Sequence, residues 1–164
     1  MSKLKRCVLV IIAAVISLMT FAGCSLFDSD KYGTTRNIYQ MFGDGKFAIK
    51  EKVVHMRPKS YTIFRRSEDY DAPLILYMFE YKEISPYVYA IGSNDLEFEQ
   101  YRDYLNGKDV DVKISYLRLN YDTGISVVWD DLTPANEDEK AIYEELCQQW
   151  ETRLKNGEGV KLHK

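Results

Sequence analysis

The stretch LILYMFEY, residues 74–81, is apolar at almost every position and decides the fold of the chain. Successive side chains of a strand point to opposite faces of its sheet, so a strand built from this stretch has both faces buried. Such a strand lies in the middle of a sheet, with covering elements on each side. We therefore expect residues 74–81 to form a central β-strand.

Segments on both sides of this run alternate between apolar and polar residues, which is typical of half-buried strands. The alternating apolar positions are Phe47, Ile49, Val53, Tyr61, Ile63, Tyr87, Tyr89 and Ile91. Residues 92–94, Gly-Ser-Asn, have the composition of a turn that ends the last of these strands. Because the expected strands follow one another closely along the chain, they predict an antiparallel β-meander.

Further strands are expected after residue 109. Val110, Val112 and Ile114 alternate with polar residues, and the alternation then changes parity, which predicts a β-bulge near Tyr116. The sequence NYDTG, residues 120–124, has the composition of a hairpin turn in which its glycine adopts a positive φ. Residues 125–129 are then the returning strand of this hairpin.

Two shorter segments have helical rather than alternating spacing. Residues 36–42 fit a short amphipathic helix. Residues 95–105 fit a longer helix, which a capping pair of Asn94 and Glu97 would start. The second helix therefore interrupts the series of strands.

The C-terminal segment has the clearest helical pattern. Asn136 and Glu139 form a capping pair after Pro134, and Asn156-Gly157 ends the run. Its apolar stripe contains Ile142, Tyr143, Leu146, Cys147, Trp150 and Leu154. A helix with one apolar face buries that face, so the sequence predicts an α+β fold: an antiparallel β-meander sheet with an inserted helix and a C-terminal helix packed on one face.

The first 24 residues have the layout of an export signal. Basic residues precede an apolar core, residues 7–18, and the junction Phe21-Ala22-Gly23-Cys24 follows it. This junction resembles the lipobox of bacterial lipoproteins, with Phe21 in place of the usual leucine. The resemblance implies cleavage before Cys24 and a diacylglyceryl group on its thiol, and it allows a further acyl chain such as palmitate on the new amino terminus. The alternative is an uncleaved transmembrane helix, because the apolar segment is just long enough to span a bilayer.

The lipobox resemblance divides the chain into three parts. Residues 1–23 are expected to be a signal peptide, residues 24–35 a lipidated tether, and residues 36–164 a single α+β domain. Two acyl chains anchor a protein stably, so we expect the domain to be held at the extracytoplasmic face of the cell membrane through Cys24.

Charge and cysteine content limit the partners of the mature chain. Removal of the signal leaves 141 of the 164 residues and changes the formal net charge from −3 to −6, because three basic residues are lost. An acidic chain without a basic block is a poor ligand for nucleic acid. Cys147 is the one cysteine that stays unmodified, so no intramolecular disulfide is expected. We expect a monomer.

Residue patterns that carry catalysis or cofactor binding are missing from the sequence. His55 and His163 have no second ligand at metal-binding spacing, and no glycine-rich nucleotide motif occurs. The sequence therefore predicts neither a metal nor a cofactor. Cys147 is interpreted as a core residue, because it lies on the apolar helix stripe.

Candidate binding residues are aromatic and acidic side chains in the expected strands. The chain has 13 tyrosines, whose side chains combine a large apolar face with a polar tip, and this combination is typical of recognition surfaces. Among them, Tyr87 and Tyr89 are the candidate binding residues. Trp129 is followed by Asp130 and Asp131 at the end of a strand, where an indole ring could stack on a sugar.

Two functions from different classes remain. The first is a membrane-anchored envelope lipoprotein without catalytic activity that binds another protein or a cell-wall polymer, which includes an immunity or inhibitor role. The second is a tethered hydrolase that uses the acidic residues near Trp129, since hydrolysis of glycosides requires two carboxyl groups. An open groove lined by tyrosines would favour binding, and a deep pocket that holds two acids would favour hydrolysis.

Overall fold

The computed structural model of the chain describes residues 35–52, 59–67 and 71–160. These residues belong to one compact unit, Gly33–Lys164. The expected export signal, Cys24 and the two histidines lie outside the described residues.

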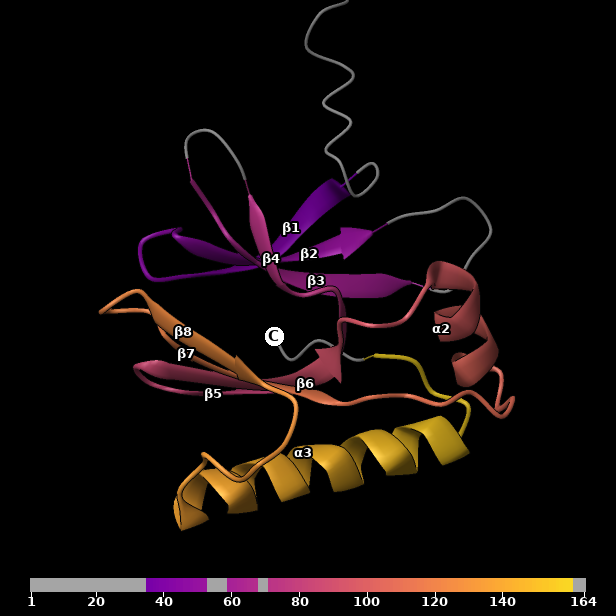
Figure 1. The fold of residues 1–164 in the computed structure, drawn as a ribbon. Helices are drawn as coiled ribbons and strands as arrows, with labels where there is room; N and C mark the ends of the chain where they lie inside the picture. The colour runs from indigo at the N-terminus through magenta and orange to yellow at the C-terminus, as the bar shows by residue number, and fades with distance from the viewer. Residues whose placement is uncertain (1–34, 53–58, 68–70, 161–164) are drawn as a thin grey trace, which may run out of the picture. The chain divides into compact units, whose positions relative to one another are not determined.

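The described residues contain eight strands, which form two antiparallel sheets of four strands each (Figure 1). Sheet A contains β1 (Thr35–Phe42), β2 (Phe47–Lys52), β3 (Ser60–Arg65) and β4 (Ala72–Ile75), in this spatial order. Sheet B contains β5 (Tyr77–Ile84), β6 (Tyr87–Ser93), β7 (Ser115–Asn120) and β8 (Ile125–Trp129). Helix α2 (Phe98–Leu105) is inserted between β6 and β7, and α3 (Glu137–Lys155) follows β8. The predicted α+β meander with an inserted and a C-terminal helix is confirmed, but the meander is divided between two sheets.

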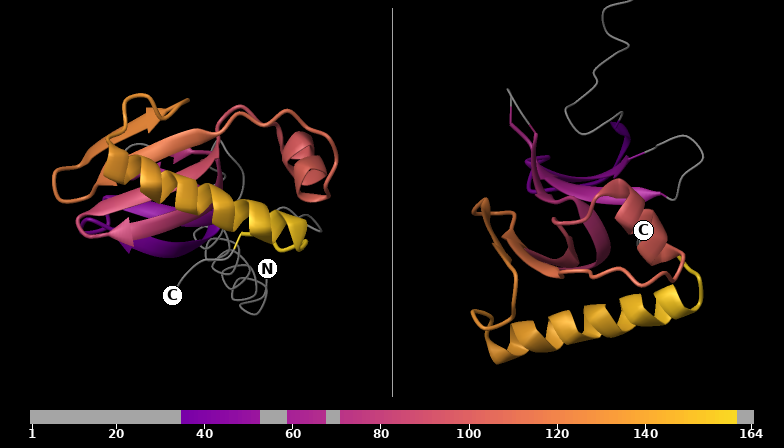
Figure 2. Two further views of the ribbon diagram at one scale, coloured as in Figure 1. Left: turned by 90° about the horizontal axis from the view of Figure 1, so that it is seen from below. Right: turned by 45° about the vertical axis from the view of Figure 1, so that its right-hand side comes forward.

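The elements form three layers, with sheet B between sheet A and α3 (Figures 1 and 2). The first core lies between the two sheets and contains Phe47, Ile49 and Ile63 from sheet A and Val88, Leu117 and Leu119 from sheet B. The second core lies between sheet B and the helices and contains Phe79, Tyr89, Ile91, Tyr101, Tyr143, Leu146 and Trp150. Sheet B therefore has two buried faces.

The sequence predicts one central strand for the apolar run 74–81, and this prediction is wrong. The chain bends at Leu76 and passes from β4 in sheet A to β5 in sheet B, and both strands lie at sheet edges. Ile75 and Met78 face the core between the sheets, whereas Tyr77 and Phe79 face the core under the helices. The run is apolar on both sides because it crosses between two cores.

Asn94 holds this crossing in place. Its side-chain oxygen accepts a hydrogen bond from the backbone N–H of Leu76 at 2.8 Å, and its side-chain nitrogen donates to the carbonyl of Leu74 at 3.1 Å. The predicted capping role of Asn94 is therefore wrong. Helix α2 starts later than predicted, with Glu97 as its N-cap in a capping box with Gln100.

Residues 36–42 form strand β1 rather than the predicted helix. The pairing of β1 with β2 has irregularities between Thr35 and Asn37 and between Ile38 and Gln40. Bulges of this kind interrupt the alternation of a strand, so its apolar residues acquired a spacing that resembles a helix.

The predicted strand before β7 and its bulge are also wrong. Val110, Val112 and Ile114 lie outside regular secondary structure, where they pack half-buried against the second core. β7 begins at Ser115 and pairs with both neighbours without a register shift, so no bulge occurs near Tyr116. The apolar alternation changes parity at the boundary between the irregular segment, residues 110–114, and strand β7.

The C-terminal half confirms the predictions that rest on local signals. The turn after β7 contains Gly124 with φ of 74°, and β8 has the predicted bounds. Asn136 and Glu139 form the predicted capping box of α3, which buries Leu146 and Trp150.

Candidate interaction site at the β8 edge

The end of β8 carries three of the five residues that the sequence singled out. The Trp129 ring lies edge-on to the Tyr143 ring of α3, with 6.3 Å between the ring centroids. The guanidinium of Arg118 lies 5.3 Å from the centroid of the Trp129 ring, a cation–π arrangement. Trp129 is therefore a half-buried part of the contact between sheet B and α3.

The other two predicted residues lie on β6. Tyr89 is buried, and its ring is edge-on to Tyr143 at 5.7 Å. Tyr87 is half-buried, and its ring lies 6.0 Å from that of Tyr89. The structure thus brings Tyr89 and Trp129 to one side chain of α3, and these rings pack the second core rather than form an open, tyrosine-lined groove.

Asp130 and Asp131 are exposed and have separate partners. The Asp130 carboxylate lies 2.8 Å from the ammonium group of Lys113, and this contact raises the pKa of Lys113. Asp131 accepts a hydrogen bond from the backbone N–H of Thr133 at 2.8 Å, and its hydrogen bonds with the side chain and backbone of Thr133 lower its pKa. Asp131 therefore stabilises the turn after β8, whereas Asp130 ties the end of β8 to the segment that precedes β7.

The start of α3 is fixed to sheet B by a buried carboxylate. Glu139 pairs with the guanidinium of Arg118 at 2.6 Å, a contact that raises the pKa of Arg118. The second Glu139 oxygen accepts a hydrogen bond from the Asn136 backbone at 3.1 Å. The carboxylate thus serves to cap α3 and to dock it on sheet B.

The free edge of β8 differs from the other sheet edges of the described residues. β8 pairs with β7 in a regular register and contains no charged residue, proline or glycine. In contrast, the pairing of β1 has two irregularities, β4 is four residues long with Pro73, and β5 has a register shift and carries Lys82 and Glu83. Natural proteins use such devices to block edge-to-edge pairing. β8 is only one residue longer than β4, but it has no register shift, no proline and no charged residue.

Two apolar side chains of β8 are exposed to solvent. Ile125 is 62% exposed and Val128 is 36% exposed. A strand edge with unpaired backbone groups and apolar side chains can accept another extended chain. We define the β8 edge as residues Ile125–Trp129 together with the charged groups at its two ends.

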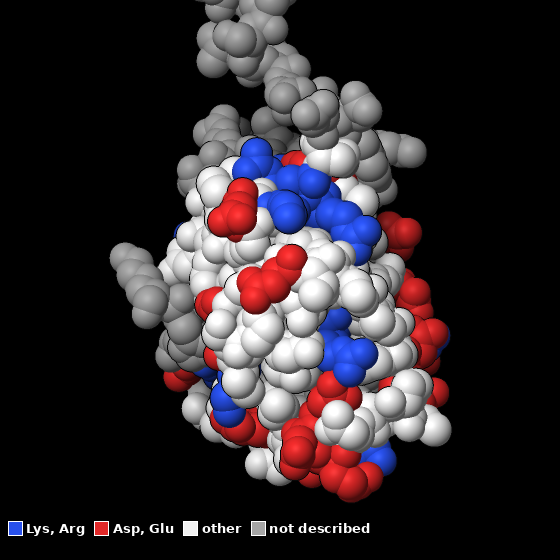
Figure 3. All heavy atoms as spheres, turned by 90° about the vertical axis from the view of Figure 1, so that its left-hand side faces the viewer, with Lys and Arg blue, Asp and Glu red and all other residues white. Residues whose placement is uncertain are grey.

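The two ends of the β8 edge carry opposite charges. At its start, the Arg65 guanidinium donates hydrogen bonds to the Gly124 carbonyl at 3.0 Å and to the Ser126 hydroxyl at 2.8 Å. At its end lie the carboxylates of Asp131 and of Asp130, which pairs with Lys113. Figure 3 views this side of the molecule: basic side chains gather toward sheet A and acidic side chains toward the start of α3.

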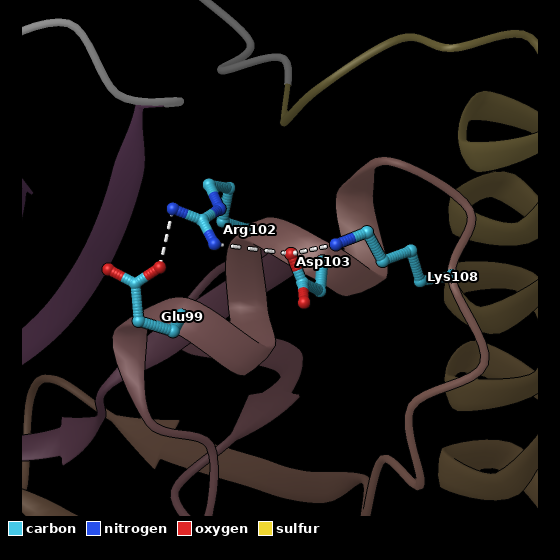
Figure 4. Close-up of polar contacts among 4 residues, drawn as sticks. All are labelled: Glu99, Arg102, Asp103 and Lys108. Carbon is cyan, nitrogen blue, oxygen red and sulfur yellow. Dashed lines mark hydrogen bonds and ion pairs between the residues drawn. The ribbon is translucent and has the colours of Figure 1, made fainter.

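Other polar groups of the described residues form no comparable site. On the outer side of α2, Glu99, Arg102, Asp103 and Lys108 pair with one another (Figure 4). A depression on α3 is lined by Glu145, Gln148, Gln149, Thr152 and Arg153, and it shares no residue with the β8 edge. Within the part of the chain that the structure describes, no cluster of three histidine, cysteine or acidic residues is arranged to hold a metal ion.

Comparisons with known proteins give no relative. No protein-family model matches the chain, and neither a curated protein nor a solved structure shows significant similarity to it. Among the described helices, none combines the length and the apolar character needed to cross a membrane. The candidate site therefore rests on its own geometry.

Proposed function

We propose that this chain is a membrane-anchored bacterial lipoprotein without catalytic activity, which binds a protein partner through the β8 edge. The observation that carries the proposal is the regular, uncharged β8 strand with its exposed Ile125. A free strand edge offers a row of backbone N–H and C=O groups, and these recognise another extended polypeptide. This geometry favours a protein partner over a cell-wall polymer, and an inhibitor or immunity protein would act in this way.

The anchor of the proposed lipoprotein is Cys24. The 12 residues from Cys24 to Thr35 could extend over about 40 Å, at roughly 3.3 Å per residue. The sheets would then stay within a short distance of the membrane and meet partners in the envelope.

Metabolic labelling tests the anchor. A bacterial host that produces the full chain is fed a fatty-acid analogue, and the parent is expected to be labelled while Cys24→Ser is not. The matched control is Cys147→Ala, which should be labelled like the parent. Equal labelling of the parent and Cys24→Ser would contradict the anchor.

Affinity capture tests the β8 edge. Tagged full-length chain is recovered from detergent-solubilised envelope, and bound proteins are identified by mass spectrometry. Ile125→Lys places a charge on the edge and is expected to abolish the specific set of captured proteins. Ile84→Lys, at an exposed position at the end of β5, is the matched control and should keep that set. Identical captured sets for both variants would contradict the proposed site.

A further inference from the structure

The β8 edge is complementary to itself. When two copies of one strand pair antiparallel about a twofold axis through the middle residue, the first residue of one copy lies opposite the last residue of the other. With Val127 at the axis, Ile125 of one copy would lie opposite Trp129 of the other. The exposed Ile125 side chain would then be covered by the aromatic residue at the far end of the partner strand.

The charges at the ends of the edge favour the same arrangement. Antiparallel pairing in this register would bring the Arg65 guanidinium of one copy to the end of the edge that carries Asp130 and Asp131 in the other, twice in each dimer. Lys113 already pairs with Asp130 there, so this end keeps one carboxylate in excess. Arg65 contacts Ser126, which lies opposite Leu119 of the inter-sheet core, so the guanidinium stands on the side of sheet B that faces sheet A. Parallel pairing of the same strands would instead bring like charges together, which is unfavourable.

We infer that the partner of the β8 edge is a second copy of this chain, paired antiparallel so that the two B sheets form one continuous eight-stranded sheet. The inference rests on the proposed function, because it uses the same edge. It departs from the monomer expected from the sequence. Each chain contributes one face of an isologous interface, and the pairing closes at two copies.

Cysteine cross-linking tests the register. Residues directly opposite in an antiparallel pair have Cβ atoms about 4.5–5.5 Å apart, close to the separation that a disulfide needs, whereas diagonal neighbours lie about 7–8 Å apart. Val127→Cys in the full chain is therefore expected to form a disulfide-linked dimer on mild oxidation. Val128→Cys lies opposite Ser126 of the other copy and is the matched control, with at least tenfold less dimer. Both substitutions are made with Cys147→Ala.

Charge exchange tests the partner. Two differently tagged full-length copies are produced together, and co-purification of the second tag is measured. Copies that carry Arg65→Glu, or copies that carry Asp130→Arg, are expected to co-purify at least fivefold less than the parent, because each homotypic pair sets like charges together. A mixture of the two variants restores both opposite-charge contacts and should co-purify like the parent.

The outcomes separate this inference from the proposed function. A Val127→Cys dimer together with recovery in the mixture of charge variants supports the second copy. Equal cross-linking of Val127→Cys and Val128→Cys, no co-purification of parent copies, or no recovery in the mixture overturns it. If the inference fails while Ile125→Lys still abolishes capture of other proteins, the β8 edge binds a different partner and the proposed function stands.

Discussion

Gly92 lies where the chain crosses from one sheet to the other. It is opposite Met78 in the pairing of β6 with β5. A Cβ atom at this position would overlap the Tyr77 carbonyl oxygen and the Cγ2 atom of Ile75, and it would lie 3.0 Å from the Cα of Met78. The backbones of β5 and β6 can approach each other closely here because glycine has no side chain.

Gly92→Ala is therefore expected to lower the free energy of unfolding by about 1–3 kcal/mol, the usual cost of forcing an additional carbon into a packed core. Urea denaturation of the parent and the variant measures the difference. Gly159→Ala is the matched control, because nothing lies within 4 Å of the added carbon there. Equal loss of stability in both variants would contradict this account of the crossing.

Gly92 and Asn94 also show a limit of reasoning from sequence. Gly-Ser-Asn has the composition of a turn, yet Gly92 and Ser93 belong to β6, and Asn94 binds the backbone of the crossing. Glycine serves turns and close backbone contacts equally well, and asparagine caps helices as readily as it bridges loops. The role of Asn94 becomes clear only from the fold, which places the backbone of Leu76 within hydrogen-bonding distance of its side chain.

Trp150 is one of the buried side chains that attach helix α3 to sheet B and to α2. This side chain is 2% exposed, its ring stacks on Phe79 at 4.9 Å, and its Nε1–H donates to the Tyr104 hydroxyl at 3.0 Å. Arg153 of the same helix forms an ion pair with the fully buried Glu80 of β5 at 2.7 Å.

Trp150→Ala is expected to lower the free energy of unfolding by about 3–5 kcal/mol, the usual cost of deleting a large buried aromatic side chain. Thermal unfolding followed by circular dichroism measures the change. Gln148→Ala, at an exposed position of the same helix, is the control and should leave the midpoint nearly unchanged. An unchanged midpoint for Trp150→Ala would contradict docking of α3 through this residue.

The elements that the sequence predicted well are those specified by neighbouring residues. The capping box and apolar stripe of α3, and the turn before β8, are local signals, and the structure confirms them. β1 has an irregular register with β2, and residues 74–81 are divided between two sheets, and neither feature is encoded in the local apolar pattern. A run that is apolar on both faces fits a central strand and a crossing strand equally well.

Burial of tyrosine side chains makes the whole molecule sensitive to alkaline pH. Desolvation is the main cause that raises the pKa of Tyr61, Tyr77, Tyr89, Tyr101, Tyr104, Tyr116 and Tyr143 above the ordinary value of 10.0. Because the pKa of each phenol is higher in the folded than in the unfolded state, the folded state favours the neutral phenol. The contribution of these groups to the free energy of unfolding is therefore complete below pH 10. This contribution is lost as the pH rises through the unfolded value and above it.

The free energy of unfolding is therefore expected to fall above pH about 10, by up to about 1.4 kcal/mol per pH unit for each tyrosine that ionises only in the unfolded state. Urea denaturation between pH 8 and pH 11.5 measures the slope. Tyr143→Phe removes one titrating group and should make the slope less steep. A stability that stays constant up to pH 11 would contradict the burial of these rings.

The candidate site was only partly accessible from the sequence. The strand end with Trp129, Asp130 and Asp131 followed from the hairpin pattern. The edge position of β8 depends on the order of strands in the sheet, and Arg65 lies 59 residues before the Gly124 carbonyl that it contacts. The signal that was missed is the composition of residues 125–129, ISVVW, which has none of the charges or prolines that protect an edge.

Each sheet is built from one continuous segment, which contributes one half of the described strands, and this has a consequence for how the protein folds. Among the described residues, every strand pairs with strands next to it along the chain, so the pairing within each sheet is local to one segment. During synthesis, sheet A can be complete once residue 75 has emerged. Its apolar face with Phe47, Ile49 and Ile63 stays uncovered until sheet B arrives. The interval between the two halves is therefore the period in which the nascent chain is most prone to aggregate and most in need of a chaperone.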